Sequence, residues 1–288
     1  MPSGWLAHNT FYAPPIFARA EPILVSFRYS SYMNELVQIN STPNAAGIVR
    51  ISLNRPEARN ALSFELIEQL ERAVATVAAD SAARVLVLSG NGKSFCAGMD
   101  LRGVLHDAQK MGLMLHGLAR VGLALRKLSI PVIAQVQGAA IGGGCGLVIA
   151  CDFAFTHEQA KLGYPEVDLG VCPAVVAPFL ISKIGAGRAR ALLLAGGLMN
   201  GQEATRIGMT THLVGVEQLD SATTDFAHTL SSGGPNAIAT TKRWLHQLDG
   251  LLEESVLTKA ANLSAEIISG HEAQERLRAR FDTTQSTS

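Results

Sequence analysis

Ala139-Ala140-Ile141-Gly142-Gly143-Gly144-Cys145-Gly146-Leu147-Val148 follows a predicted strand at 132–136 and opens an apolar helical stretch. Its glycines therefore place bare backbone N–H groups at the N-terminus of a helix. Free donors and the aligned helix dipole stabilise negative charge there, and the missing side chains let a ligand oxygen come within hydrogen-bonding distance. The segment predicts an anion site made of main chain.

Short β-rich runs alternate with helical runs along the 288 residues, which is typical of an α/β fold. Three regions are predicted: an N-terminal extension at 1–33, disordered or non-native, with Met33 as a candidate start; a core at 34–230; and a helical C-terminal lid or trimerisation region at 231–288. Strands are predicted at 48–53, 84–88, 132–136 and 153–156, and helices at 63–79, 104–128, 174–184 and 188–195.

The composition excludes several classes of protein. Lys plus Arg and Asp plus Glu both total 24, and the basic residues are scattered, so nucleic-acid binding is not expected. No run reaches the roughly 18 to 20 apolar residues of a membrane helix. The four cysteines lie in apolar runs without CxxC spacing, which favours reduced thiols and a cytoplasmic location. No histidine spacing indicates a metal site.

The glycine cluster does not match the phosphate-binding motifs. A Walker loop requires Gly-Lys-Ser/Thr, and a dinucleotide fingerprint that starts at Gly142 requires glycine where Leu147 stands. On the glycines alone, tight packing of helix against strand remains as good an interpretation as a ligand site.

Two further segments favour the ligand site. Lys93-Ser94-Phe95-Cys96-Ala97-Gly98-Met99-Asp100-Leu101 follows the strand at 84–88, and a second main-chain donor from it would complete a site for a carbonyl oxygen that becomes an enolate. In Tyr164-Pro165-Glu166-Val167-Asp168-Leu169-Gly170, Glu166 stands among apolar residues, where desolvation should raise its pKa toward neutral. A solvated loop glutamate is the alternative.

Together these segments resemble the crotonase, or enoyl-CoA hydratase/isomerase, superfamily from about Leu36 to the C-terminus. Asn54-Arg55-Pro56-Glu57-Ala58-Arg59-Asn60-Ala61-Leu62 is similar to the family's CoA-binding turn. The segments 95–101 and 142–144 are similar to its two oxyanion segments, and Cys151-Asp152 and Pro165-Glu166 fall at the family's spacing.

The resemblance implies a spiral of ββα units with a helical C-terminal region, assembled as a homotrimer or a dimer of trimers. It implies that the N–H groups of Met99 and Gly143 hold the thioester oxygen of an acyl-CoA substrate and that Glu166 moves the proton. It implies no metal and no cofactor beyond the CoA moiety, which would be lined by Ala58, Arg59, Ala97, Met99, Asp100, Leu101 and Arg102.

One departure from the family concerns the second acid of two-glutamate hydratases, whose position holds Gly146. A single acid can hydrate a 2-enoyl thioester or shift a double bond between Δ3 and Δ2, and its chemistry leaves both open. The runs 143–148 and 170–179 resemble bacterial methylglutaconyl-CoA hydratases, which favours hydration of a branched, carboxylated 2-enoyl-CoA. The alternatives are a Δ3,Δ2-enoyl-CoA isomerase and a catalytically inactive CoA-ester-binding protein.

Other polar and reactive side chains receive structural interpretations. Cys96 and Cys145 have no histidine in a partnering motif, so packing is expected rather than nucleophilic catalysis. Asp152 and Asp168 are expected to orient backbone or to pair with a nearby arginine.

Overall fold

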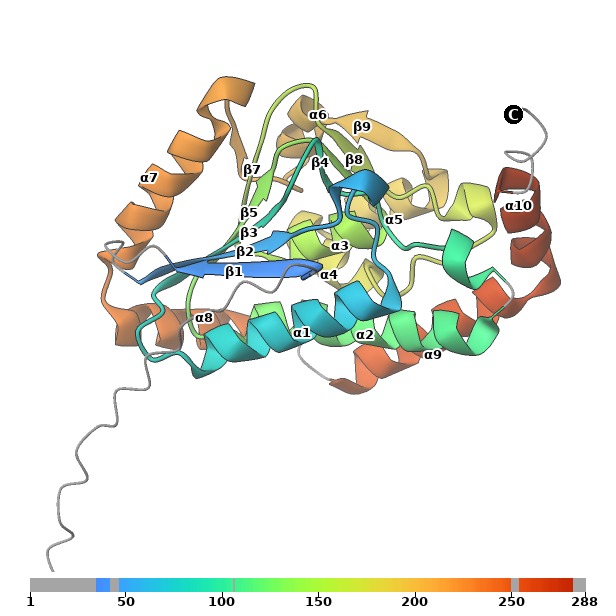
Figure 1. Ribbon diagram of the computed structural model, residues 1–288, viewed down its shortest axis with the longest axis horizontal. Helices are drawn as coiled ribbons and strands as arrows, with labels where there is room; N and C mark the ends of the chain where they lie inside the picture. The colour runs from blue at the N-terminus through green and yellow to red at the C-terminus, as the bar shows by residue number, and fades with distance from the viewer. Residues whose placement is uncertain (1–34, 42–46, 106, 250–253, 282–288) are drawn as a thin grey trace, which may run out of the picture. The chain divides into compact units, whose positions relative to one another are not determined.

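Two β-sheets organise the computed structural model, which describes residues 35–41, 47–105, 107–249 and 254–281 (Figure 1). The larger sheet has the order β1 (Val37–Ser41), β2 (Ile48–Leu53), β3 (Val85–Gly90), β5 (Val132–Val136), β7 (Phe153–Thr156) and β10 (His212–Leu213). The smaller has the order β4 (Ser94–Cys96), β6 (Ala139–Ile141), β8 (Lys161–Gly163) and β9 (Leu198–Asn200). The predicted extension at 1–33, with Met33, lies outside the described residues.

The chain alternates between the two sheets. β3, β5 and β7 are parallel neighbours in the larger sheet, and the strands that follow them, β4, β6 and β8, are parallel neighbours in the smaller one. Among the described strands, the antiparallel pairs are β1 with β2 and β8 with β9. Helical structure follows each of the pairs β1–β2, β3–β4, β5–β6 and β7–β8, so the predicted spiral of ββα units is confirmed.

The helices begin where local capping groups allow. α1 (Phe64–Ala79) starts at the predicted Ser63, whose hydroxyl accepts the N–H of Leu66 at 3.2 Å. α2 (Ala108–Lys127) starts later than predicted, because the Asp107 carboxylate caps the N–H of Lys110 at 2.8 Å. Before it, η2 (Arg102–Val104) forms a separate turn.

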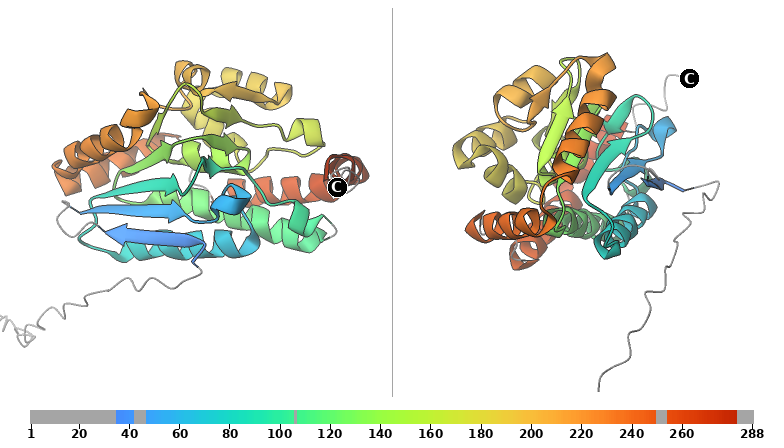
Figure 2. Two further views of the ribbon diagram at one scale, coloured as in Figure 1. Left: turned by 45° about the horizontal axis from the view of Figure 1, so that its top comes forward. Right: turned by 90° about the vertical axis from the view of Figure 1, so that its left-hand side faces the viewer.

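Alternate residues of the larger sheet face two different layers. Leu86 and Leu88 of β3 join the core that includes α1 and α2, whereas Val85 and Val87 join the cluster beneath α7 (Leu219–Ser231). Figure 2 shows α7 on one side of this sheet and α1 and α2 on the other. The near-continuous apolar strands follow from burial of both faces.

The chain after 233 is helical in its described parts, as predicted, with α8 (Pro235–Asp249), α9 (Glu254–Ser269) and α10 (His271–Phe281). All four cysteines are free. No helix in the described ranges has the length and apolarity needed to cross a bilayer. The remaining helical elements are η1 (Pro56–Ala58), α3 (Gly143–Ala150), η3 (Val167–Leu169), α4 (Ala177–Ile184), α5 (Ala186–Ala195), α6 (Gly201–Arg206) and η4 (Val216–Gln218).

Candidate active site

Three strands of the smaller sheet end side by side. β4, β6 and β8 run parallel, with Cys96 paired to Ala140 and Ile141 paired to Gly163, so their carboxyl ends share one edge. The segments that leave these ends are 97–99, 142–144 and 164–166, which are the three predicted from the sequence. Ligands of α/β sheets bind outside the carboxyl ends of strands, and this edge is therefore the candidate site.

Two backbone N–H groups at this edge lack an acceptor. Gly143 is the first residue of α3, where no intrahelical acceptor exists, and it follows a turn at Gly142 with φ +54°. Met99 forms a parallel bridge with Leu62, in which Gly98 O and Asp100 N face Leu62 and the Met99 N–H points away. Within the described residues neither N–H has a hydrogen-bond partner.

The two N–H groups belong to turns that touch. A Cβ placed on Gly143 would lie 3.6 Å from Met99 Cγ. Gly98, with φ +96°, lies so near the end of β6 that a Cβ on it would stand 2.8 Å from the carbonyl oxygen of Ile141. Glycine at 98 therefore permits this approach, both through its positive φ and through its missing side chain.

Glu166 lies at the same edge of the smaller sheet. Its carboxyl lies against the turn before α3, since a Cβ on Gly142 would meet Glu166 Oε1 at 2.8 Å. Oε2 is buried and has no hydrogen-bond partner in the described structure. Burial raises the pKa of the Glu166 carboxyl to about 7, and a backbone hydrogen bond opposes the rise only in part. The desolvated carboxyl expected from the sequence is therefore present, rather than a solvated loop glutamate.

The groups that face Glu166 were not predicted. Cys145, one turn into α3, and Tyr164, on the same turn as Glu166, both interact with it electrostatically. Tyr164 is fully buried, and its hydroxyl has no partner among the described residues. Burial raises the pKa of the Cys145 thiol to about 12, which excludes a thiolate nucleophile at neutral pH and agrees with the packing interpretation.

The predicted CoA-binding segments lie next to each other. Ala97 N–H donates to the carbonyl of Arg59 at 3.0 Å, and Leu62 N–H donates to the carbonyl of Gly98 at 2.8 Å. Ala58 and Ala97 are half-buried, and Arg59 is exposed beside them, so a ligand can reach them. Arg59 and Asn60 both have positive φ, and the buried Asn60 side chain offsets this strain with bonds to Arg55 N and Ser94 O.

Asp100 and Arg102 of this set already contact other side chains. The Asp100 carboxylate accepts from Arg55 Nη1 at 2.6 Å, which ties the two turns together. The Arg102 guanidinium lies 5.5 Å from the ring centroid of Phe281 on α10. Leu101, between Asp100 and Arg102 in the sequence, is half-buried. The structure thus brings the predicted CoA residues to one surface, where the Asp100 carboxylate is already paired with Arg55.

Val176 occupies the space beside Gly146. A Cβ on Gly146 would lie 2.6 Å from Val176 Cγ1. Val176 immediately precedes α4. Gly146, at the position of the second acid of two-glutamate hydratases, therefore has no side chain, and a methyl group of Val176 fills the space that a side chain would need.

Gly146→Ala is expected to lower the free energy of unfolding by about 1 to 2 kcal/mol, because overpacking against Val176 outweighs the gain in helix propensity. The double variant Gly146→Ala/Val176→Ala should lose less free energy of unfolding than the two single variants lose when their losses are added. Urea unfolding measures both. Gly112→Ala in α2 is the control, since its Cβ would meet Ala265 Cβ at an ordinary 3.7 Å and should be neutral or stabilising. A stabilised Gly146→Ala would contradict the packing argument.

The C-terminal helices hold the Glu166 turn. α10 packs on η3, where a Cβ on Gly170 would stand 3.2 Å from Ala273 Cα. Ser264 Oγ on α9 donates to the Cys172 carbonyl at 2.8 Å. No local pattern in the sequence indicates these contacts, because about 90 or more residues separate the partners of each.

Asp152 lies at the other end of α3, where it orients backbone, as one of its two expected roles, and pairs with a lysine rather than an arginine. Its Oδ2 accepts from Lys242 Nζ at 2.6 Å and from the N–H of Val132 at 2.8 Å. The described residues contain no group of three or more His, Cys, Asp or Glu side chains that could hold a metal ion.

Comparison with known proteins identifies the family. The family model for enoyl-CoA hydratase/isomerase matches residues 43–285. The chain belongs to the enoyl-CoA hydratase/isomerase family. It is 35% identical over 196 residues to a crotonyl-CoA hydratase of Syntrophomonas wolfei, which covers 66% of this chain and 74% of the relative. It is 30% identical over 203 residues to a short-chain-enoyl-CoA hydratase of Clostridium acetobutylicum, covering 68% and 77%.

Solved structures of the family share the fold. An enoyl-CoA hydratase from Bacillus anthracis matches with a TM-score of 0.70 and 29% identity, over 86% of this chain and 97% of that one. An enoyl-CoA hydratase from Bacillus halodurans matches with a TM-score of 0.78 over 85% and 100%, and its 24% identity shows the fold alone. The two mixed sheets and C-terminal helices are therefore a crotonase fold, and this member of the enoyl-CoA hydratase/isomerase family is an enzyme of that class.

Proposed function

We propose that this enzyme adds water to a 2-enoyl-CoA thioester and forms the 3-hydroxyacyl-CoA. The observation that carries the proposal is the Glu166 carboxyl, buried against Gly142 and beside the unpaired N–H groups of α3. A proton carrier with a pKa of about 7 at an oxyanion site suits proton transfer at a carbon next to a thioester.

A single acid suffices for this addition. The Glu166 carboxylate takes a proton from water as the water oxygen bonds to C3, and the electron pair of the double bond moves onto the thioester oxygen. The N–H groups of Met99 and Gly143 stabilise the resulting enolate. Glu166 then returns its proton to C2, which restores the carboxylate. Beyond the CoA moiety of the substrate, these steps require no cofactor.

For the acyl group we propose a branched, carboxylated chain of the methylglutaconyl type. The support is the likeness of 143–148 and 170–179 to bacterial methylglutaconyl-CoA hydratases. A free carboxylate on the acyl chain needs a cation. Arg276 of α10 is one candidate, since its Cδ lies 2.9 Å from the Cβ position of Gly170, and its Nε donates to Glu272 Oε1 at 3.1 Å.

The test is incubation of the purified enzyme with 3-methylglutaconyl-CoA and, separately, with crotonyl-CoA. Hydration is followed by loss of the enoyl thioester absorbance and by a mass gain of one water. Preference for 3-methylglutaconyl-CoA supports the acyl assignment. Preference for crotonyl-CoA rejects that assignment but keeps the hydratase, and turnover of neither removes both.

A Δ3,Δ2-enoyl-CoA isomerase is the second candidate, and the apolar contact of Val176 with Gly146 favours it. That methyl group stands where a second acid would hold water, and isomerisation needs none. Conversion of a 3-enoyl-CoA to the 2-enoyl isomer without a gain in mass would assign this reaction. Binding of CoA esters without any turnover would instead indicate a catalytically inactive binding protein.

The rate should depend on pH through Glu166. Water activation needs the carboxylate, and burial raises the pKa of Glu166 to about 7. We therefore expect kcat/KM to fall about tenfold per pH unit below that value and to level off above it. Initial rates between pH 5 and pH 9 measure the profile. A flat profile through pH 6 would show that another group carries the proton.

The assembly is predicted to be a homotrimer or a dimer of trimers. Large apolar side chains on the described surface, such as Leu194 and Val216, are more than half exposed and suit burial between subunits. Light scattering after size-exclusion chromatography measures the mass, and a monomer at micromolar concentration would reject the assembly.

A further inference from the structure

A pocket outside the candidate active site lies at the opposite end of α3 from Gly143. Its volume is about 490 Å³, and no residue of the candidate active site lines it. It lies where the C-terminal end of α2, the start of β5 and helices α4 and α8 meet. Six side chains that can carry charge line it: Arg126, Asp152, Lys183, Lys242, His246 and Asp249.

Each of the two lysines has two hydrogen-bond acceptors. Lys242 Nζ donates to Asp152 Oδ2 at 2.6 Å and to the Ile130 carbonyl at 2.9 Å. Lys183 Nζ donates to the carbonyls of Cys151 and Asp152 at 2.8 and 2.9 Å, at the C-terminal end of α3. An ammonium group has three N–H donors, so each lysine keeps one beyond these contacts.

Arg126 also has an unused donor. Its Nη2 donates to Asp249 Oδ2 at 2.9 Å and to Ser182 Oγ at 3.3 Å. Its Nε is buried without a partner in the described structure, and the side chain is only 7% exposed. An unpartnered donor on a buried guanidinium costs free energy unless a ligand oxygen accepts from it.

The charges in this pocket do not cancel. Three cations face two carboxylates, and burial lowers the pKa of His246, which is then neutral at pH 7 and adds no charge. Burial also lowers the pKa values of Lys183 and Lys242, although the neighbouring Asp152 partly opposes this. One excess positive charge remains, and a monoanion would neutralise it.

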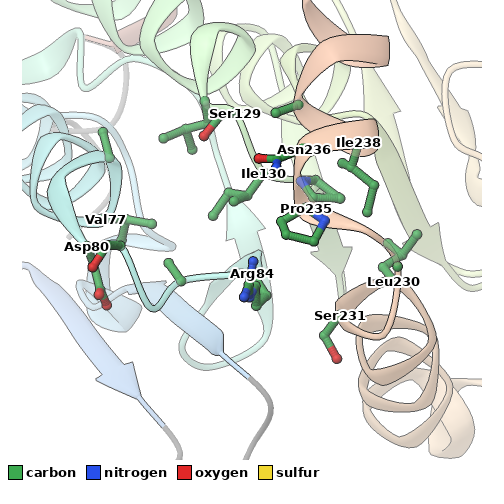
Figure 3. A pocket seen from close by; sticks show the side chains of 17 residues that line it. Val77, Asp80, Arg84, Ser129, Ile130, Leu230, Ser231, Pro235, Asn236 and Ile238 are labelled. Carbon is green, nitrogen blue, oxygen red and sulfur yellow. The ribbon is translucent and has the colours of Figure 1, made fainter.

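Apolar residues form most of the remaining wall of the pocket. Leu230 of α7 and Ile238 and Leu245 of α8 line it, with Pro131 and Phe153 at the starts of β5 and β7. Leu230, Ile238 and Pro131 also border a neighbouring hollow of about 220 Å³. Figure 3 shows Leu230 and Ile238 on the α7–α8 side of that hollow, facing Arg84 and Ile130. The two hollows thus share these three apolar residues, and Arg84 and Asp80 also line the second hollow.

We propose that this pocket binds an amphipathic monocarboxylate, with its carboxylate at Arg126, Lys183 and Lys242 and its alkyl chain against the apolar wall. A single excess charge matches a monoanion better than a phosphate dianion. The six apolar lining residues, with Ala237 among them, require a hydrocarbon portion that a bare inorganic anion lacks.

Calorimetric titration of the full chain with sodium octanoate tests the site. We expect saturable binding that Leu245→Glu weakens by roughly tenfold or more, because the new carboxylate enters the apolar wall and repels the ligand. The matched control is Leu248→Glu on the same helix, which is 65% exposed and does not line the pocket, and which should bind as the unchanged chain does. Neither residue belongs to the candidate active site, so both variants should keep enoyl-CoA turnover.

Two control ligands separate the contribution of the carboxylate from that of the alkyl chain. Octanamide, which lacks the charge, and inorganic phosphate, which lacks the chain, should each bind at least roughly tenfold more weakly than octanoate. Arg126→Gln provides a second variant and should weaken octanoate binding while circular dichroism stays unchanged. Absence of saturable binding, equal effects of Leu245→Glu and Leu248→Glu, or equal binding of octanamide would each overturn the proposal.

Discussion

Glu166→Gln should lower the rate of hydration of a 2-enoyl-CoA by roughly two to four powers of ten, which is the usual contribution of general acid–base catalysis to an enzymatic rate. Glutamine has nearly the same shape and keeps the contact with Gly142, but it can neither accept a proton from water nor return one to C2. Steady-state kinetics at pH 8 measure the loss, which should fall on kcat because the thioester contacts are unchanged.

The same variant should be more stable than the unchanged enzyme at high pH. The folded pKa of Glu166, about 7, lies above the ordinary 4.5, so the folded state holds the proton more tightly than the unfolded state does. Stability of the unchanged enzyme therefore falls as pH rises from about 4.5 to 7, by at most about 3 kcal/mol, and the variant escapes this loss. Urea unfolding at pH 5 and pH 8 measures the difference. Near-normal turnover in Glu166→Gln would assign the proton to another group.

Removal of the Gly143 N–H should cost roughly a hundredfold to a thousandfold in kcat. Gly143→Pro replaces that donor with a ring carbon, and proline fits the first position of a helix. The loss should appear for every enoyl-CoA tested, since in the proposed mechanism the donor contacts the thioester oxygen and not the acyl chain.

Gly143→Ala is the matched control for this change. It adds the same Cβ, which meets the flexible Leu118 Cδ2 at 2.9 Å and Leu62 Cδ1 at 3.3 Å, but it keeps the N–H. We expect it to lose only a few-fold in rate. If the proline and alanine variants lose equally, the Gly143 N–H does not stabilise the enolate, and packing alone explains the glycine.

Local patterns in the sequence predicted much of the fold. β2, β5 and β7 occupy the predicted ranges, because apolar runs of strand length are bounded by turn residues. The stripe of apolar residues after Ser63 predicted α1 and its buried face. The start of α2 was predicted too early, since the apolar pattern continues through a turn that the Asp107 cap separates from the helix.

The candidate site was predictable only in part. Glycine-rich turns after strands and an acid among apolar residues are visible in the sequence, so the segments at 97–99, 142–144 and 164–166 could be named. The contact of Val176 with Gly146 and the packing of α10 on the Glu166 turn could not, because these pairs are distant in sequence and no periodicity records them.

The sequence by itself determined which segments become strands and helices and where bare N–H groups occur. It also determined that Glu166 has no second acid beside it, because position 146 is glycine. Only the tertiary structure decided that three turns meet at one edge, that Glu166 is desolvated there, and that three cations gather at the far end of α3. The physical reason is that secondary structure depends on residues within a few positions of each other. Desolvation and uncompensated charge depend instead on everything that packs around a group.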